Sequence, residues 1–140
     1  MSEYYKDNLL ISTDPARLDL DAICDFLSRA YWAEGRTRAT VAKTLEHSLC
    51  FGLYDGEQQI GFARVITDYA TLAWLCDVFI HEDYRGRGLG KWLMSVIIDH
   101  PKVQRVRRFL LATRDAHGLY RPFGFTELKS PERWMERLGE

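Results

Sequence analysis

The feature that most constrains this chain is residues 80–93, where a long apolar run passes through three closely spaced glycines into an amphipathic stretch. The apolar run, residues 71–80, has the length and composition of a strand that is buried on both faces of a sheet. Residues 89–99 place apolar side chains at helical spacing, and Pro101 follows them. The sequence therefore predicts a buried strand, a tight turn and a helix in succession.

The turn between this strand and this helix has the properties of an anion site. Backbone N–H groups in the first turn of a helix lack internal partners, and the helix dipole places partial positive charge there. Glycine lets an anion approach the backbone, although each glycine costs about 1 kcal/mol of helix propensity relative to alanine. A turn that only connected the two elements would gain nothing from this loss, and so we interpret it as a pyrophosphate site. Its residues are Arg85, Gly86, Arg87, Gly88, Leu89, Gly90 and Lys91.

Two common phosphate-binding motifs do not match this turn. A Walker A loop requires Ser or Thr after its lysine, and here Trp92 follows Lys91. The dinucleotide fingerprint requires a third glycine at the position that Lys91 occupies. The pattern that remains is Arg85-x-x-Gly88-x-Gly90.

This pattern resembles the signature of the GNAT acetyltransferases, Gln/Arg-x-x-Gly-x-Gly/Ala. Residues 116–125 are similar to a second motif of the family, Ala-x-x-x-Tyr followed by Gly-Phe, and they stand in the expected order after a strand. The resemblance covers roughly residues 50–128 well and residues 9–49 in outline. One departure is Thr113, which stands where the family often has an asparagine that bonds the cofactor.

The order of the predicted elements indicates a mixed sheet with helices on both faces. The resemblance implies a GNAT-like α/β (α+β) fold with a mostly antiparallel, six- to seven-stranded central sheet that is splayed between the central strand and the next. We expect one N-acetyltransferase domain over residues 1–140. Strands are expected at residues 9–13, 50–54, 59–67, 71–80, 106–113 and 123–128. Helices are expected at residues 20–31, 37–49, 89–99 and 115–121.

For the donor, the resemblance implies acetyl-CoA as co-substrate, with no metal. The pyrophosphate would lie on residues 85–91, and the pantetheine would contact the main chain of Val78, Phe79 and Ile80. A backbone N–H near Phe79 would polarise the thioester carbonyl. Tyr120 would contact the cofactor and act as general acid, since a phenol with a pKa of about 10 can protonate a thiolate of about 8.5. The alternative for Tyr120 is an aromatic residue that packs a short helix.

Asp77, the one charge in the apolar strand, is the candidate general base. Two alternatives remain open for it: a buried acceptor that fixes a neighbouring loop, or an anchor for the positive charge of the substrate. Glu34, Asp68 and His81 are weaker candidates, and a water chain could replace a dedicated base. Four further residues are candidates for acceptor binding, where aromatic rings could cage an ammonium or simply pack. They are Tyr31, Trp32, Asp68 and Trp74.

The reaction that the resemblance implies is transfer of an acetyl group to a primary amine, with a small molecule preferred as acceptor. The amine would attack the thioester directly. A protein or peptide N-acetyltransferase and a non-catalytic acyl-CoA-binding module are the alternatives. A homodimer is an open alternative to a monomer, because similar enzymes are often dimeric.

Composition excludes several other classes of protein. The net charge is −1, and the basic residues at 102–114 largely coincide with a predicted strand, so we expect no nucleic-acid partner. No apolar stretch approaches the roughly 20 residues that cross a bilayer, and the first residues do not resemble a signal peptide. We therefore expect a cytoplasmic protein without a membrane partner. The 3 cysteines are irregularly spaced, which argues against disulfides and zinc.

Overall fold

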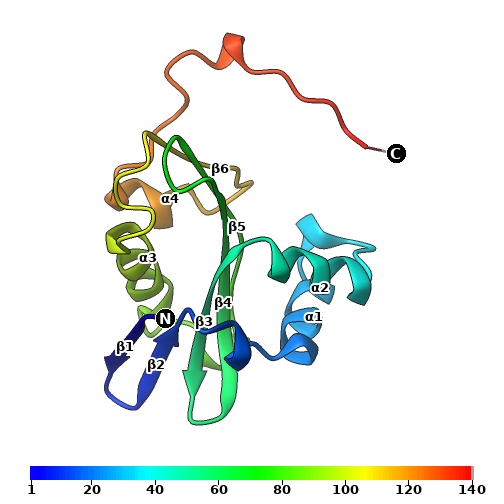
Figure 1. The fold of residues 1–140 in the computed structure, drawn as a ribbon, viewed down its shortest axis with the longest axis vertical. Coiled ribbons are helices and arrows are strands. Elements are labelled where there is room, and N and C mark those ends of the chain that lie inside the picture. The colour runs from blue at the N-terminus through cyan, green and yellow to red at the C-terminus, as the bar shows by residue number, and fades with distance from the viewer. Residues whose placement is uncertain (140) are drawn as a thin grey trace.

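The computed structural model describes residues 1–139 and contains one six-stranded sheet with helices on both faces (Figure 1). The strands lie in the sheet in the order of the chain. All neighbouring strands are antiparallel except β5 and β6, which are parallel. The mixed, mostly antiparallel sheet that we predicted is confirmed. The strands are β1 (Glu3–Lys6), β2 (Leu9–Ser12), β3 (Leu49–Asp55), β4 (Gln58–Thr67), β5 (Leu72–Ile80) and β6 (Arg108–Leu111).

Four α-helices form close to where periodicity predicts them. Asp19 and Thr37 begin the first two, because the side chain of each accepts a hydrogen bond from a backbone N–H three residues further on. Five short 3₁₀ turns complete the helical structure of the described part: η1 (Pro15–Arg17), η2 (Tyr31–Ala33), η3 (Glu82–Tyr84), η4 (Arg121–Phe123) and η5 (Pro131–Arg133). The α-helices are α1 (Leu20–Ser28), α2 (Arg38–Glu46), α3 (Leu89–Asp99) and α4 (His117–Tyr120).

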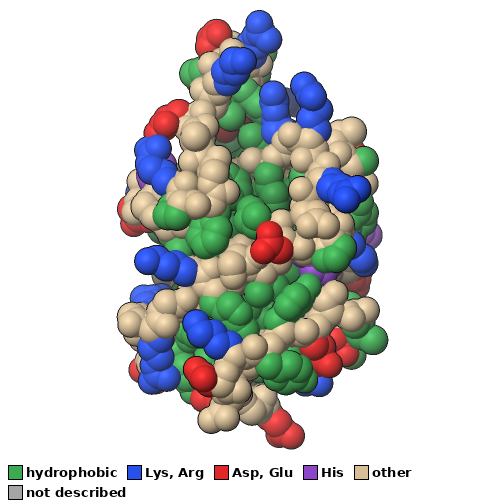
Figure 2. Space-filling model, turned by 90° about the vertical axis from the view of Figure 1, so that its left-hand side faces the viewer, with side chains coloured by type: hydrophobic (Ala, Val, Ile, Leu, Met, Phe, Trp, Pro, Cys, Tyr) green, Lys and Arg blue, Asp and Glu red, His purple; other side chains and the backbone are tan. Residues whose placement is uncertain are grey.

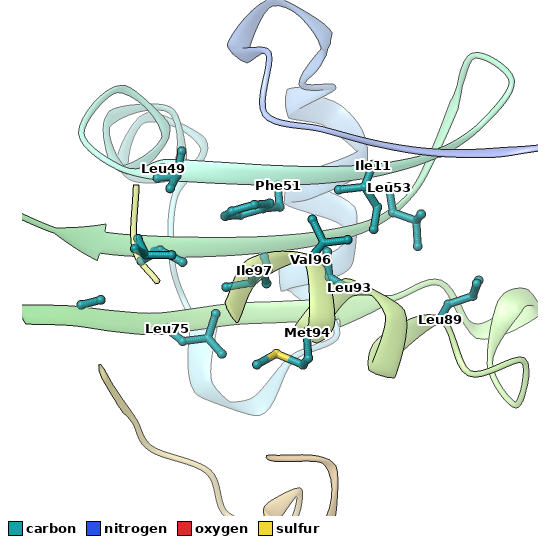
Figure 3. Packing of buried hydrophobic residues seen from close by; sticks show 14 of the residues in the cluster. Ile11, Leu49, Phe51, Leu53, Leu75, Leu89, Leu93, Met94, Val96 and Ile97 are labelled. Carbon is teal, nitrogen blue, oxygen red and sulfur yellow. The ribbon is translucent and has the colours of Figure 1, made fainter. Parts of the chain in front are cut away.

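The sheet separates two hydrophobic cores. On one face, α3 packs on the sheet, and Figure 3 shows Leu93, Met94 and Ile97 of α3 meeting strand residues such as Phe51 and Leu75. On the other face, α1 and α2 cover a second set of buried side chains. Burial of each large apolar side chain stabilises the fold by about 1.5–3 kcal/mol, so the two layers hold the sheet rigidly between them. The second set comprises Ile23, Phe26, Leu27, Ala30, Ala33, Val41, Cys50, Phe62 and Phe79.

At Asp77, the alternation of side chains along β5 between the two faces of the sheet is interrupted. The φ angle of Asp77 is 54°, and the pairing of β4 with β5 shifts by one residue opposite it, which is the signature of a β-bulge. Before the bulge, Leu75 belongs to the core under α3. After it, Phe79 belongs to the core under α1, where its ring stacks on Phe26 with centroids 4.7 Å apart. Aspartate is one of the few residues other than glycine that adopt this left-handed conformation readily.

The sheet opens beside the bulge. The pairing of β6 with β5 covers only residues 72–75 of β5, although β5 continues to Ile80. The second half of β5 therefore has no strand beside it on that side within residues 1–139. The expected splay between the central strand and the next is confirmed, and it leaves main-chain groups of β5 facing open space.

The structure differs from the prediction at both ends of the sheet, by one additional strand and by one predicted strand that does not form. Strand β1 was missed because its side chains are largely exposed and its sequence lacks apolar alternation; its signal was the turn at Asp7, where φ is 53°. The strand expected at residues 123–128 does not form, since Pro122 lies within η4 and Gly124 adopts a φ of 93°. Phe125 still packs on Phe109 and Tyr120, and the chain beyond it projects from the body (Figure 1).

The projecting C-terminal segment carries exposed apolar side chains. A hollow of about 880 Å³ lies at its base against β6. Figure 2 shows apolar side chains at the surface below this segment, with Lys and Arg side chains around it. The large apolar residues of the segment that remain exposed are Leu128, Trp134, Met135 and Leu138.

Candidate active site

A cavity of about 450 Å³ occupies the place where β5 and β6 separate. The second half of β5, the residues after β6, the turn η2 and the start of α3 line it. This cavity brings together half of the residues that the sequence singled out, from positions between 31 and 120. The predicted residues that line it are Tyr31, Trp32, Trp74, Asp77, Val78, Ile80, Gly90 and Tyr120.

The glycine turn presents an unblocked helix end beside the cavity. Gly88 is the N-cap of α3 with a φ of 74°, Gly86 has a φ of 82°, and no side chain caps the helix. Trp92 makes the first backbone hydrogen bond of the helix, to the carbonyl of Gly88 at 3.0 Å. Among the described residues, the N–H groups of residues 89–91 make no backbone hydrogen bond, so they are available to an anion.

Exposed cations surround this helix end. The Nε of Arg85 donates to the carbonyl of Ile80 at 3.0 Å, which ties this side chain to the end of β5. The guanidinium of Arg87 lies 5.0 Å from the ring centroid of Tyr84, whose hydroxyl donates to Asp55 at 2.6 Å. Lys91 is exposed on the first turn of α3. The turn thus combines free N–H groups with positive charge, which are the two properties of a phosphate site.

The carboxylate of Asp77 is enclosed by three donors, and its side chain is only 1% exposed. Its Oδ2 accepts from the Nε of Arg64 at 2.9 Å and from an Nη of Arg36 at 2.8 Å. Its Oδ1 accepts from the indole N–H of Trp32 at 2.9 Å. This geometry matches the alternative in which Asp77 is a buried acceptor that fixes a neighbouring loop, here the residues around η2.

Sequence reasoning missed the role of Arg36. Arg64 is the only charge inside the apolar strand β4, as Asp77 is inside β5, and these two exceptions together signal a buried ion pair. Arg36 lies in a polar loop 41 residues before Asp77 and gives no such local signal.

Tyr120 is buried to 8% exposure at the side of the cavity that α4 forms. Its ring packs edge-on against Phe125, with centroids 6.1 Å apart. Burial, and secondarily the nearby Tyr31, raises the pKa of Tyr120 to about 12. Within residues 1–139 no hydrogen bond involves its hydroxyl, and no buried polar side-chain atom lacks a partner, so the hydroxyl is accessible. Tyr120 lines both this cavity and a neighbouring hollow of about 260 Å³ between β6 and α4.

Tyr31, which lines the cavity, contacts Arg114 in the loop after β6. The backbone N–H of Arg114 donates to the hydroxyl of Tyr31 at 3.1 Å, and the guanidinium lies 3.8 Å from the centroid of the same ring. Tyr31 also meets Trp32 edge-on at 5.2 Å. Next to this contact, the hydroxyl of Thr113 accepts from the N–H of Ala116 at 3.0 Å, so it is used locally. The loop at η2 and the loop after β6, which both line the cavity, therefore contact each other.

Several predicted residues lie outside the cavity lining. Asp68 holds the turn between β4 and β5, where it accepts from three backbone N–H groups and the hydroxyl of Thr71; these hydrogen bonds hold its pKa well below its ordinary value. Glu34 lines a separate hollow beside α1. The Nδ1 of His81 accepts from the N–H of Asp83 at the start of η3. The main chain of Phe79 is on the open half of β5, but its side chain packs in the core under α1.

Cys76 is the one cysteine that lines the cavity among the described residues. Burial raises the pKa of its thiol to about 11, and it raises the pKa of Cys50 to about 12. Both side chains are therefore neutral thiols at neutral pH, and neither has the properties of a nucleophile. Within residues 1–139, no three His, Cys, Asp or Glu side chains are grouped so that they could hold a metal ion. No helix of the described chain has the length and apolar character that spanning a membrane requires.

Comparison with known proteins identifies the family. The acetyltransferase (GNAT) family matches residues 20–125. A GNAT-family protein of Xanthomonas campestris pv. campestris is 46% identical with a TM-score of 0.91, over 95% of this chain and 94% of that one. A Gibberella zeae protein named as an acetyltransferase is 31% identical, over 82% of this chain and 77% of its own length.

A Clostridium acetobutylicum protein solved with acetyl-CoA is similar in fold alone, with 14% identity, a TM-score of 0.67, and coverage of 94% of this chain and 95% of that one. The family match and the two closer similarities agree with the uncapped helix end and the splayed sheet. The chain belongs to the GNAT acetyltransferase family.

Proposed function

We propose that this protein is an N-acetyltransferase that moves an acetyl group from acetyl-CoA to a primary amine by direct attack on the thioester. The observation that carries the proposal is that one cavity is lined by Gly90 of the uncapped helix end, by the open half of β5 and by Tyr120. A protein that only bound acyl-CoA would need the first two features and would have no use for the third.

The chain offers a place for each part of acetyl-CoA. Residues 85–91 would hold the pyrophosphate through N–H groups and cations. The main chain of Val78, Phe79 and Ile80 would bond the pantetheine along the open edge of β5. A backbone N–H near Phe79 would polarise the carbonyl of the thioester, where negative charge develops. When bound, acetyl-CoA supplies an activated acetyl group.

Tyr120 would donate the proton that the departing sulfur requires. Because its pKa is raised to about 12, the phenol is fully protonated at neutral pH and is present in the donor form. Of the roles that the sequence left open for Asp77, we propose positioning: the carboxylate holds Trp32 and Arg36 at the cavity. The acceptor ammonium would then lose its proton to water rather than to a dedicated base.

Direct attack, rather than an acetylated enzyme, follows from the state of Cys76. We expect that Cys76→Ala changes the turnover number less than about threefold, because a thiol with a pKa of about 11 is rarely ionised at neutral pH. Initial rates with both substrates varied would give intersecting lines, and mass spectrometry after mixing with acetyl-CoA alone would find no acetylated protein. An acetylated Cys76 would contradict direct attack.

A small-molecule acceptor fits the cavity better than a protein chain. The cavity volume of about 450 Å³ is of the size that small ligands occupy. The contact between Tyr31 and Arg114 joins two of the loops that line the cavity, and a polypeptide acceptor that entered between these loops would have to displace it. Cytoplasmic location and homodimer formation remain predictions; the exposed apolar residues of the C-terminal segment are the feature that bears on the second.

The test of the donor site is isothermal calorimetry with acetyl-CoA on the wild type and on Gly88→Glu. We expect a Kd in the micromolar range for the wild type. The glutamate would put negative charge beside the pyrophosphate and weaken binding by about 100-fold or more.

Gly56→Glu is the matched control for this variant. Gly56 has a φ of 61° in the β3–β4 hairpin, and neither glycine would bring a new Cβ within 4 Å of another group. Both variants therefore carry the same backbone strain of about 1–2 kcal/mol, and only one carries charge at the helix end. Equal binding by Gly88→Glu and Gly56→Glu, or no binding by the folded wild type, would reject the proposed donor site.

A further inference from the structure

Three charged side chains in the lining of the cavity together carry more positive than negative charge. The cluster consists of two guanidinium groups, Arg36 and Arg64, and one carboxylate, Asp77, so its formal charge is +1. It is well shielded from water, since the side chains of Arg64 and Arg36 are 9% and 21% exposed. The other carboxylate of the lining, Asp115, is largely exposed and lies 3.7 Å from Arg114. An excess charge in such a place is unfavourable until an ion of opposite sign joins it.

Both guanidinium groups keep donors that the protein does not use. Arg64 bonds Asp77 through Nε and the hydroxyl of Ser48 through one Nη at 3.1 Å, which leaves its other Nη. Arg36 uses one Nη for Asp77 and leaves its Nε and its other Nη. No buried side-chain nitrogen or oxygen among residues 1–139 lacks a partner, so these N–H groups reach open space, and both arginines line the cavity.

The same geometry disfavours a purely cationic acceptor. The carboxylate that could have attracted an ammonium already binds two guanidinium groups and an indole N–H. A polyamine would therefore meet net positive charge. Guanidinium groups match the paired oxygens of carboxylates and phosphates, and the bonds they make to such groups are strong.

Resting on the proposed function, we propose that the acceptor is an amine that also carries an oxyanion, either a carboxylate or a phosphate, which Arg36 and Arg64 bind in the cavity. Tyr31, Trp32 and Trp74 supply flat surfaces for the rest of the molecule. The two arginines have a second effect. Nearby positive charge disfavours the ammonium form of the acceptor and so favours the neutral amine that attacks, in a site where Asp77 is not free to remove the proton.

The test compares acceptors in pairs that differ only in the oxyanion, with thiol release as the measure of transfer. One arm sets α-amino acids against their carboxamides. The other sets phosphoethanolamine against ethanolamine and glucosamine 6-phosphate against glucosamine, with spermidine as a cationic reference. We expect the oxyanion member of one arm to be favoured by about 10- to 100-fold in kcat/KM, and the arm identifies carboxylate or phosphate.

Arg36→Gln is the variant, and Arg38→Gln is its control, because Arg38 pairs with Asp21 on the outside of α2. We expect Arg36→Gln to lower the preference within a pair about tenfold, chiefly through KM, while the Kd for acetyl-CoA is unchanged. A binding measurement without acetyl-CoA tests this inference independently of the donor site. The favoured oxyanion compound should raise the Tm of the wild type and of Arg38→Gln, and it should raise the Tm of Arg36→Gln less. Equal or better transfer to spermidine or to the compounds that lack the oxyanion would overturn the inference even if acetyl-CoA binds. The absence of such a difference in Tm would overturn it as well.

Discussion

Replacing Asp77 by alanine is expected to lower the free energy of unfolding by about 3–5 kcal/mol. This is a large part of the roughly 5–15 kcal/mol that is typical of a domain. The change leaves Arg64 and Arg36 without their counter-charge in a shielded site, and the indole N–H of Trp32 without its acceptor. It also puts alanine at a φ of 54°, which aspartate tolerates better. Urea denaturation of the purified variant measures the loss.

The surface pair of Asp25 and Arg29 provides the control for the Asp77 variant. Asp25 is 63% exposed, and removal of such a pair is expected to cost less than about 1 kcal/mol. Asp77→Asn should fall between the two, because the amide oxygen can still accept from Trp32 while the charge is lost. If Asp77→Ala were as stable as Asp25→Ala, the two guanidinium groups would not depend on Asp77, and its proposed positioning role would fail.

Tyr120→Phe should lower kcat by about 10²- to 10⁴-fold, the usual contribution of a positioned acid, without changing the Kd for acetyl-CoA. The phenylalanine ring can keep the edge-on contact with Phe125, so the fold is expected to persist. Since burial raises the pKa of Tyr120 to about 12, the wild-type rate should show no loss from its ionisation below about pH 11. Thiol release at saturating substrate and calorimetry give the two quantities.

Tyr54→Phe separates loss of an acid from loss of any buried hydroxyl. The hydroxyl of Tyr54 donates to the carbonyl of Arg17 at 3.0 Å, and Tyr54 is not among the residues of the cavity. This variant is expected to reduce stability and to leave kcat unchanged. Wild-type turnover by Tyr120→Phe would show that water protonates the sulfur, and the acid role would be discarded.

The local parts of the fold could be predicted because their signals are short-range. The strand before the glycines, the turn and α3 follow from composition and helical spacing within about 25 residues, and the comparisons confirm the family that these residues suggested. The edge strand β1 was not predicted, because an exposed strand needs no alternation of apolar residues. The strand expected at residues 123–128 had suitable residues, but the positive φ of Gly124 turns the chain away from the sheet.

The candidate site was harder to predict because its key contacts are distant in sequence. Asp77 meets Trp32 and Arg36, which precede it by 45 and 41 residues, and nothing local announces either contact. Asp68 is the opposite case, because its contacts are local and it does not line the cavity. A lone carboxylate after a strand suggested substrate binding, but hydrogen bonds to residues 70–72 use it to hold the turn.

The bulge at Asp77 connects the strand proposed to bind the donor with the loop proposed to bind the acceptor. One residue both bends the strand along which the donor would lie and anchors the loop that forms the acceptor side. A new acceptor loop grafted from a relative would therefore have to bring its own partners for this carboxylate, or it would disturb the donor strand as well. Redesign of selectivity is better begun at Tyr31 and Trp74, which line the cavity without bonding Asp77, while Trp32 and Arg36 are left in place.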